Sequence, residues 1–534
     1  MAGTGNKATE GAAKADLMDE WWRGAVIYEA YVRSFRDSDA DGQGDLHGLV
    51  EGLDYLAALG VDAVWLTPVS PSPNFDSGYD VADYYGIEPA FGTMADFQEL
   101  VAQAHARGLK VVLDQVYSHS SHLHPWFLES ASSRDNPKAD WYVWADPRPD
   151  GGPPNNWLGR FGGFAWEWNS TRKQYYLHNF LIEQPDLNLH NPDVQEEILR
   201  VMRHWFDLGV DGLRLDVVNF YMQDPALRDN PSSRRNDAPA NPYYLQSHVY
   251  DRSRPENLAF VALMRAEADR AGGKMLLGEI SCDRQVERMA EYTTPGLLHT
   301  AYSFELLGPG LSGSHIAKTV AEAGANGAWP CWAFSNHDVI RVATRWGAAG
   351  NRDRVKVLQA MLLSLRGSIC LYQGEELGLP HSEVPRHRLQ DPEAIRFWPN
   401  HRGRDGARTP MPWLADGVSL GFSTVDGWLP ADAGHGSLAV SLQDSDPASP
   451  LNHLRAMTSL RRAHPALRLG SFDVLMATET TLVFRRGHAD ESLICGFNFG
   501  QESIALSFHG PTLAGSLASG ALGPDSYVIL KDSP

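Results

Sequence analysis

The chain has 534 residues, 43% of them hydrophobic and 16 of them tryptophan, which predicts a large soluble globular protein of more than one domain. Its formal net charge of -20 excludes a broad basic face, so neither nucleic acid nor an anionic membrane is an expected partner. No run is long and apolar enough to span a bilayer.

The first residues, 1–20, are small or charged and lack the apolar core of a secretory signal, which predicts a disordered leader. The four cysteines are far apart and form no CxxC pair, which indicates reduced thiols. Both features favour a cytoplasmic protein. The sequence leaves a monomer and a homodimer equally open.

An unusual acidic loop follows, DSDADGQGDLHGL at residues 37–49. Alternate acids in a flexible loop can direct several oxygens at one hard cation such as calcium. An EF-hand is excluded because its twelfth position needs Glu, and Gly48 stands there. The alternative is an acidic turn that only faces solvent.

Eight short apolar runs recur along the chain, separated by amphipathic stretches such as MADFQELVAQAHARG. Such runs are typical of buried parallel strands with helical crossovers. Eight units predict an α/β fold, a (β/α)₈ TIM barrel. The runs are 25–32, 61–67, 109–116, 211–218, 274–280, 299–306, 332–338 and 368–374.

Two segments depart from this rhythm. Residues 117–180 are too long and too rich in Trp, Pro and Gly for a crossover, which predicts a small inserted domain after the third strand. Beyond about 460 short alternating strands predict a C-terminal all-β domain, residues 461–534. The barrel then comprises 21–116 and 181–460, with a long functional loop at 380–430.

Ionisable residues close four of the apolar runs. Because the carboxyl ends of barrel strands form the active face, these side chains are expected in one bowl. A single strand-end acid is most often a helix cap, but burying charge at four strand ends without a purpose would be costly. The residues are Asp114 with His119, Arg214 with Asp216, Glu279, and His337 with Asp338.

Four motifs in order, DQVYSH, GLRLDVV, GEI and SNHD, resemble the signature regions of the α-amylase superfamily, glycoside hydrolase family 13. The stretches WWRGAVIYEAYVRSF, QPDLNL, YQGEELGLP and GRDGARTPMPW are similar to its bacterial α-glucosidase and oligo-1,6-glucosidase branch. All of this lies after about residue 21.

The resemblance implies the catalytic roles. Asp216 matches the nucleophile of a retaining glycosidase, with Arg214 expected to hold it ionised. Glu279 matches the general acid/base, for which we expect a raised pKa. Asp338 matches the third acid, which grips sugar hydroxyls.

The resemblance also implies a pocket for one terminal glucose. Tyr79 would stack on the sugar, and an ion pair between Asp76 and Arg404 would close the pocket behind it, with Arg408 as a competitor for Arg404. His119 and His337 would hydrogen-bond the ring. Phe161 and Phe180 are expected either as pocket walls or as core residues.

In this branch the acidic loop resembles a structural calcium or magnesium site. Asp37, Asp39, Asp41 and Asp45 would give side-chain oxygens and Gln43 its carbonyl oxygen. The ion is expected to brace the loop. No organic cofactor is expected.

The resemblance implies a retaining, exo-acting α-glucosidase on short α-glucosides, with transfer of glucose to hydroxyl acceptors. Val217 resembles α-1,6-cleaving members, whereas DVVNFYMQDPALRDNP is similar to enzymes that favour α-1,4 bonds, so linkage stays open. Ser118 departs from the usual Asn. The alternatives are an oligo-1,6-glucosidase, a sucrose-acting or trehalose-forming relative, and a binding module, which the three acids disfavour.

Overall fold

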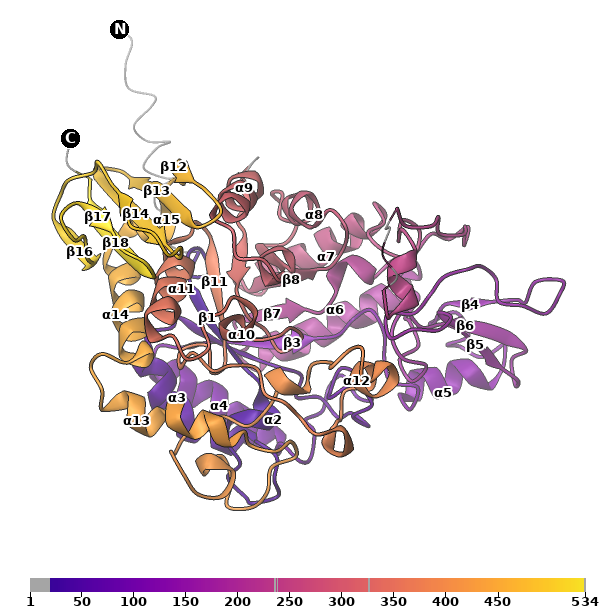
Figure 1. The fold of residues 1–534 in the computed structure, drawn as a ribbon. Coiled ribbons are helices and arrows are strands. Elements are labelled where there is room, and N and C mark those ends of the chain that lie inside the picture. The colour runs from indigo at the N-terminus through magenta and orange to yellow at the C-terminus, as the bar shows by residue number, and fades with distance from the viewer. Residues whose placement is uncertain (1–19, 235–236, 238, 325–326, 533–534) are drawn as a thin grey trace, which may run out of the picture.

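Eight parallel strands form a barrel at the centre of the computed structural model, which describes residues 20–234, 237, 239–324 and 327–532 (Figure 1). The strand order is β10-β11-β1-β2-β3-β7-β8-β9, and a parallel bridge between Ala301 and Pro330 joins the two ends. Each of the eight apolar runs coincides with one strand, and β10 begins one residue before the predicted run. The strands are β1 Val26–Ala30, β2 Ala63–Leu66, β3 Lys110–Gln115, β7 Gly212–Leu215, β8 Met275–Ile280, β9 Thr300–Ser303, β10 Cys331–Ala333 and β11 Ser368–Tyr372.

Helices follow the strands and cover the barrel from outside. Helix α4 shows why they form: Thr93 and Asp96 make a capping box, and buried Phe97, Leu100, Val101 and Ala104 recur at helical spacing. This amphipathic stretch was predicted from the sequence. The barrel helices are α3 Leu46–Ala58, α4 Met94–Ala106, α6 Pro192–Asp207, α7 Asn257–Arg270, α8 Gln285–Tyr292, α9 Gly313–Ala323 and α11 Arg352–Ser364, with the short α2 Val32–Phe35 and α10 Val342–Arg345.

The insertion lies between β3 and α6, as predicted. It contains α5 Pro125–Ser132 and a three-stranded antiparallel sheet in the order β4-β6-β5. Figure 1 shows it projecting from the barrel on the side away from the C-terminal strands. The strands are β4 Trp144–Ala145, β5 Trp166–Asn169 and β6 Gln174–Leu177.

Residues 380–430 run mostly without regular structure, and the α-helix within them is the short α12 Pro392–Phe397. Three more helices lead out of the barrel: α13 Val440–Asp444, α14 Pro450–Ala463 and α15 Pro465–Leu469. The segment therefore stays over the barrel as a loop, where its arginines reach the carboxyl ends of the strands.

The C-terminal part is all β, as predicted. Its main antiparallel sheet has the order β12-β13-β14-β18-β16 and lies beside α11 and α14 (Figure 1). Its exact limit, and those of the other domains, stay predictions. The strands are β12 Asp473–Ala477, β13 Thr481–His488, β14 Glu491–Asn498, β16 Thr512–Gly515 and β18 Ser526–Lys531, with the pair β15 Ile504–Ala505 and β17 Ala521–Leu522.

Two fully buried arginines join this sheet to the barrel. Arg461 of α14 donates to the carbonyl oxygens of Gly24, Leu363, Leu365, Gly367 and Leu467. Arg486 of β13 donates to those of Ser364, Gly470 and Ser471. Burial lowers the pKa of the Arg461 guanidinium well below its usual range.

The predicted leader lies outside the described residues except for Glu20. Nowhere in the described ranges does a helix combine the length and apolar character that a membrane crossing requires.

Candidate active site

One buried guanidinium, that of Arg214, stands at the centre of the strand ends. It follows Leu213 on β7 and is surrounded by acids: its Nη1 lies 2.8 Å from Asp114 Oδ1 and 2.6 Å from Asp216 Oδ1. Its Nη2 lies 2.7 Å from Glu279 Oε2 and 2.8 Å from the Tyr302 hydroxyl. The structure therefore brings the residues that close β3, β7 and β8 onto one cation.

The chain turns sharply just after Asp216. Val217 has a positive φ of 36°, which is strained for a β-branched residue and is typical of functional sites. In this conformation the Val217 amide donates to Glu279 Oε2 at 3.1 Å. The turn thus holds Asp216 and Glu279 on adjacent strand ends, facing the same space.

The two carboxyl groups differ in acidity. Burial raises the pKa of Asp216 to about 7, although Arg214 acts in the opposite direction. Burial, with the charges of Asp216 and Asp338, raises the pKa of Glu279 to about 8. Asp216 therefore loses its proton before Glu279. The raised pKa of Glu279 matches the prediction, whereas Arg214 does not lower the pKa of Asp216 below its usual range because burial outweighs its charge.

Asp338 is the most acidic of the three. Burial opposes its ionisation, but the neighbouring charges, among them the guanidinium groups of Arg404 and Arg408, hold the pKa of Asp338 well below its usual range. Arg408 Nη2 lies 2.8 Å and Arg404 Nη1 3.3 Å from Asp338 Oδ1. At neutral pH this carboxylate is therefore ionised, and it lies on the wall of the cavity described next.

The three acids line a cavity of 980 Å³. This volume suits a ligand of one to several sugar rings. Phe161 and Phe180 line it, so neither is merely a core residue. The other predicted residues on its wall are Asp76, Tyr79, His119 and Arg404.

An ion-paired cluster forms part of the wall of this cavity. Arg404 Nη2 lies 2.6 Å from Asp76 Oδ1, so Asp76 pairs with Arg404 and not with Arg408, which contacts Asp338 instead. Arg404 also binds Asp391 Oδ1 through Nε and Nη2, at 2.9 and 2.7 Å. Asp76 and Arg404 of this cluster therefore line the cavity as a fixed ion pair.

His119 and Tyr79 are held by neighbours on the same wall. His119 Nε2 lies 3.1 Å from both the Tyr79 carbonyl and Gln184 Nε2, and its Nδ1 lies 2.8 Å from the Ser118 hydroxyl. Ser118 therefore keeps a hydrogen bond to the histidine. Burial lowers the pKa of His119 to about 4, so the ring is neutral at neutral pH.

Three residues that contact predicted site residues were not named from the sequence. Glu29 contacts His337, Asp391 contacts Arg404, and Gln184 contacts Asp76 and His119. Glu29 carried a signal that could have been used, since it is the one charged residue in the apolar strand VIYEA. Gln184 opens the stretch QPDLNL and Asp391 is the N-cap of α12, but neither pattern indicates which distant side chain each residue contacts.

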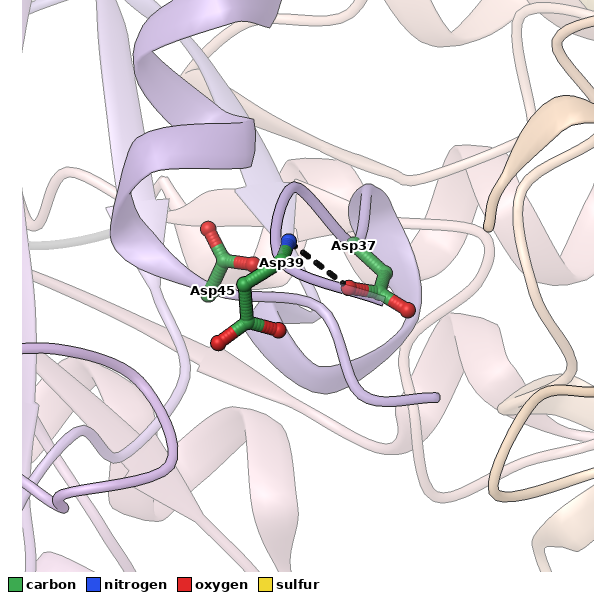
Figure 2. A group of neighbouring side chains, drawn as sticks. All are labelled: Asp37, Asp39 and Asp45. Carbon is green, nitrogen blue, oxygen red and sulfur yellow. Dashed lines mark hydrogen bonds between the residues drawn. The ribbon is translucent and has the colours of Figure 1, made fainter. Parts of the chain in front are cut away.

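The acidic loop brings three of its predicted ligands together. Asp37, Asp39 and Asp45 each offer an oxygen within 4.8 Å of the others (Figure 2). Asp41 is not in this group; its Oδ1 accepts the Gln43 amide at 2.7 Å. Burial and the charges of the neighbouring acids raise the pKa of Asp39, as expected where like charges meet.

This loop is fixed to the distant segment 422–428. The Asp37 amide donates to the Phe422 carbonyl at 2.9 Å, and the Ser423 hydroxyl donates to Asp37 Oδ2 at 2.5 Å. The Trp428 amide donates to the Gly42 carbonyl at 2.8 Å. Asp37 and Asp45 are therefore preorganised by backbone and hydroxyl donors, and hard oxygen ligands in a cluster fit a cation such as calcium.

The structure is a (β/α)₈ barrel whose strand ends place three acids around one arginine. This arrangement is typical of a class of proteins that cleave carbohydrates. Comparison with known families agrees: the model of the α-amylase catalytic domain matches residues 29–470. The chain belongs to this family, glycoside hydrolase family 13.

Among its relatives is a "Probable alpha-glucosidase" of Rhizobium meliloti (strain 1021), 49% identical over 515 residues that cover 94% of this chain and 93% of the relative. An "Oligo-1,6-glucosidase" of Parageobacillus thermoglucosidasius is 35% identical, covering 90% and 91%. The solved structure of an "alpha-glucosyl transfer enzyme, XgtA" is 48% identical with a TM-score of 0.93, covering 96% and 100%. The branch predicted from the sequence is confirmed.

Proposed function

We propose that this protein is a retaining, exo-acting α-glucosidase that releases glucose from the non-reducing end of short, maltose-type α-glucosides and also transfers it to hydroxyl acceptors. The observation that carries the proposal is the bridge that Arg214 makes between Asp216 and Glu279 at the wall of a cavity that the ion pair of Asp76 and Arg404 also lines. Retaining hydrolysis needs two carboxyl groups about 5 Å apart, and one shared guanidinium favours such a spacing.

In the first step Asp216 attacks the anomeric carbon of the bound glucose. The bond from this carbon to the glycosidic oxygen breaks as a bond to Asp216 forms, and the proton of Glu279 moves to the leaving oxygen. The order of the pKa values, Asp216 below Glu279, supports these roles.

In the second step Glu279 removes a proton from water as the water oxygen attacks the same carbon. The bond to Asp216 breaks, and glucose leaves with its original configuration. If the hydroxyl of a second sugar or alcohol replaces water, the product is a new glucoside. The likeness to the α-glucosyl transfer enzyme supports this second outcome.

Exo action rests on the cluster of Asp76, Arg404 and Asp391. A longer chain would have to cross these ion-paired side chains to extend past the terminal glucose. In this proposal the leaving group extends away from the cluster. Ionised Asp338 is positioned to accept hydrogen bonds from hydroxyl groups of that glucose.

Preference for α-1,6 bonds is the second candidate, favoured by one observation. Val217 lines the cavity directly after Asp216, the proposed nucleophile. A time course with maltose, isomaltose and sucrose, followed by chromatography of glucose and new glucosides, separates these functions. Faster release of glucose from maltose supports the proposal, and faster release from isomaltose supports the second candidate. Sucrose consumption without free glucose indicates a transferase or isomerase.

A calcium or magnesium ion is proposed for the acidic loop. Asp37, Asp39 and Asp45 would hold it, and bound there it would neutralise the repulsion of the three carboxylates. These residues lie away from the catalytic acids, so their part is to keep the loop against segment 422–428. We also propose a cytoplasmic location, supported by four free cysteines, and either a monomer or a homodimer.

A further inference from the structure

Glu29 is a buried acid with a single hydrogen-bond partner. It lies in β1 with its side chain fully buried, and its Oε1 lies 2.5 Å from Nδ1 of His337. Its Oε2 has no hydrogen-bond partner, and no Lys or Arg in the described ranges forms an ion pair with it. An ionised carboxylate in this place would be buried without a compensating charge in contact, which is strongly unfavourable.

The direction in which Tyr79 donates its hydroxyl proton determines whether Nε2 of His337 carries a proton. Tyr79 Oη lies 3.0 Å from Asp114 Oδ2 and 2.7 Å from His337 Nε2, but it has one proton to donate. Asp114 is the stronger acceptor because it binds Arg214 as an anion. Since Tyr79 donates to Asp114, its oxygen accepts from His337, and Nε2 of His337 carries a proton.

The other nitrogen, Nδ1, faces Glu29. A protonated Nδ1 would make His337 a cation, yet burial and the charges of Arg408 and Arg214 lower the pKa of His337 well below its usual range, although the Asp338 carboxylate opposes them. Burial also raises the pKa of Glu29 well above its usual range. The charged groups that act on Glu29 are Arg214, which opposes this rise, and Asp338 and Asp114, which add to it.

We propose that Glu29 is a neutral carboxylic acid that donates its proton to Nδ1 of His337 and so fixes this ring in the Nε2–H form. The hydrogen bonds then run in one direction, from Glu29 to His337, to Tyr79 and to Asp114. Nε2–H also faces Asp338 Oδ2 at 3.4 Å. Glu29 is thus a positioning residue for the sugar-binding wall, an inference that rests on the proposed glucosidase function.

Two substitutions of Glu29 separate the effect of its hydrogen-bond donation to His337 from the effect of filling the same space. In Glu29→Gln the amide N–H can donate to Nδ1 as the acid does, whereas Glu29→Leu fills similar space without a donor. Glu376→Gln is the matched control, because Glu376 is also fully buried but binds Tyr28 and Tyr55 away from the cavity. Each protein is assayed with an α-glucoside from pH 5 to 9.

We expect Glu29→Gln to keep kcat within about twofold and both limbs of the pH profile in place, since a neutral acid is replaced by a neutral amide. Glu376→Gln should do the same because Glu376 lies away from the cavity. Glu29→Leu should lower kcat about tenfold or more, the cost of an unpaired buried acceptor. If Glu29 is ionised, Glu29→Gln removes a negative charge and lowers the pKa of Glu279, which moves the basic limb to lower pH. That shift, or equal kcat in both Glu29 variants, overturns the proposal.

A second readout does not need activity. The ¹⁵N spectrum of histidine-labelled protein, with His337 identified by its loss in His337→Gln, reports which ring nitrogen carries the proton. We expect Nε2–H in the unsubstituted protein and in Glu29→Gln, and a mixture of the two neutral forms in Glu29→Leu. A protonated Nδ1 in the unsubstituted protein refutes the proposal, even if the protein proves to have another activity.

Discussion

Loss of Arg404 is expected to destabilise the protein strongly, because three carboxylates depend on it. Arg404 binds Asp391 through two nitrogens and Asp76 at 2.6 Å, while Asp338 retains Arg408 at 2.8 Å. In Arg404→Leu two buried acids therefore lose their ion-pair partner. Breaking one buried pair costs about 3 to 5 kcal/mol, so we expect at least a loss of this size in the free energy of unfolding at pH 7.

The loss should depend on pH. Arg404 and Arg408 outweigh burial and hold the pKa of Asp391 below its usual range, so its contribution is present above the unfolded pKa and is lost as pH falls through the folded one. In Arg404→Leu the cation is gone, burial raises the pKa of Asp391, and a proton can neutralise it. The difference in stability between the two proteins should therefore be largest near pH 8 and smaller near pH 5.

Urea unfolding, followed by tryptophan fluorescence at pH 5 and pH 8, measures this difference. The matched control is Arg402→Leu, because Arg402 pairs with Glu383 at the surface, where ion pairs contribute little. We expect Arg402→Leu to unfold at the same urea concentration as the unsubstituted protein. The reasoning would be refuted if Arg404→Leu had the same urea midpoint as the unsubstituted protein. It would also be refuted if the difference in stability between the two proteins were larger at pH 5 than at pH 8.

Four further predictions concern activity and the acidic loop. The pH profile of kcat/KM should rise through about pH 7 as Asp216 ionises and fall above about pH 8 as Glu279 loses its proton, and a broad plateau from pH 5 to 9 would contradict this. Asp216→Asn should lower kcat by about 10⁴-fold without loss of folding, and equal activity in initial-rate assays would end the nucleophile assignment. A chelator should lower the melting temperature of the unsubstituted protein but not that of Asp39→Asn, and calcium should restore it; equal shifts in both would exclude the loop as the site. Val217→Thr should raise the ratio of maltose to isomaltose cleavage severalfold, and an unchanged ratio of kcat/KM values would show that this side chain does not set linkage.

The sequence predicted the barrel well because each strand is a local apolar run. A buried parallel strand needs apolar residues on both faces, so a segment such as KVVLDQ carries its own signal. The acids at the strand ends could be placed in one bowl by topology alone. Arg404 and Asp76 could be paired only through the family resemblance, since they are 328 residues apart.

The contacts of Glu29 and Asp391 could not be predicted, because they depend on how distant loops and strand ends meet. Glu29 and His337 are 308 residues apart, and neither the apolar run around Glu29 nor the motif SNHD indicates that the two side chains meet. The balance of burial and charge at Asp216 also needed the structure. Sequence motifs show that Arg214 lies nearby, but they do not show how completely water is excluded from both groups.

The two buried arginines, Arg461 and Arg486, make the C-terminal sheet difficult to replace with a sheet from another protein. A polypeptide truncated before β12 would keep Arg461 but would lose Arg486. It would also lose the strands that lie beside α11 and α14. A foreign sheet grafted in its place would have to present a guanidinium at the same depth to the Ser364 carbonyl. Shortened or chimeric versions of this enzyme should therefore be designed with the segment from Gly24 through Arg486 inherited as one unit from a single parent.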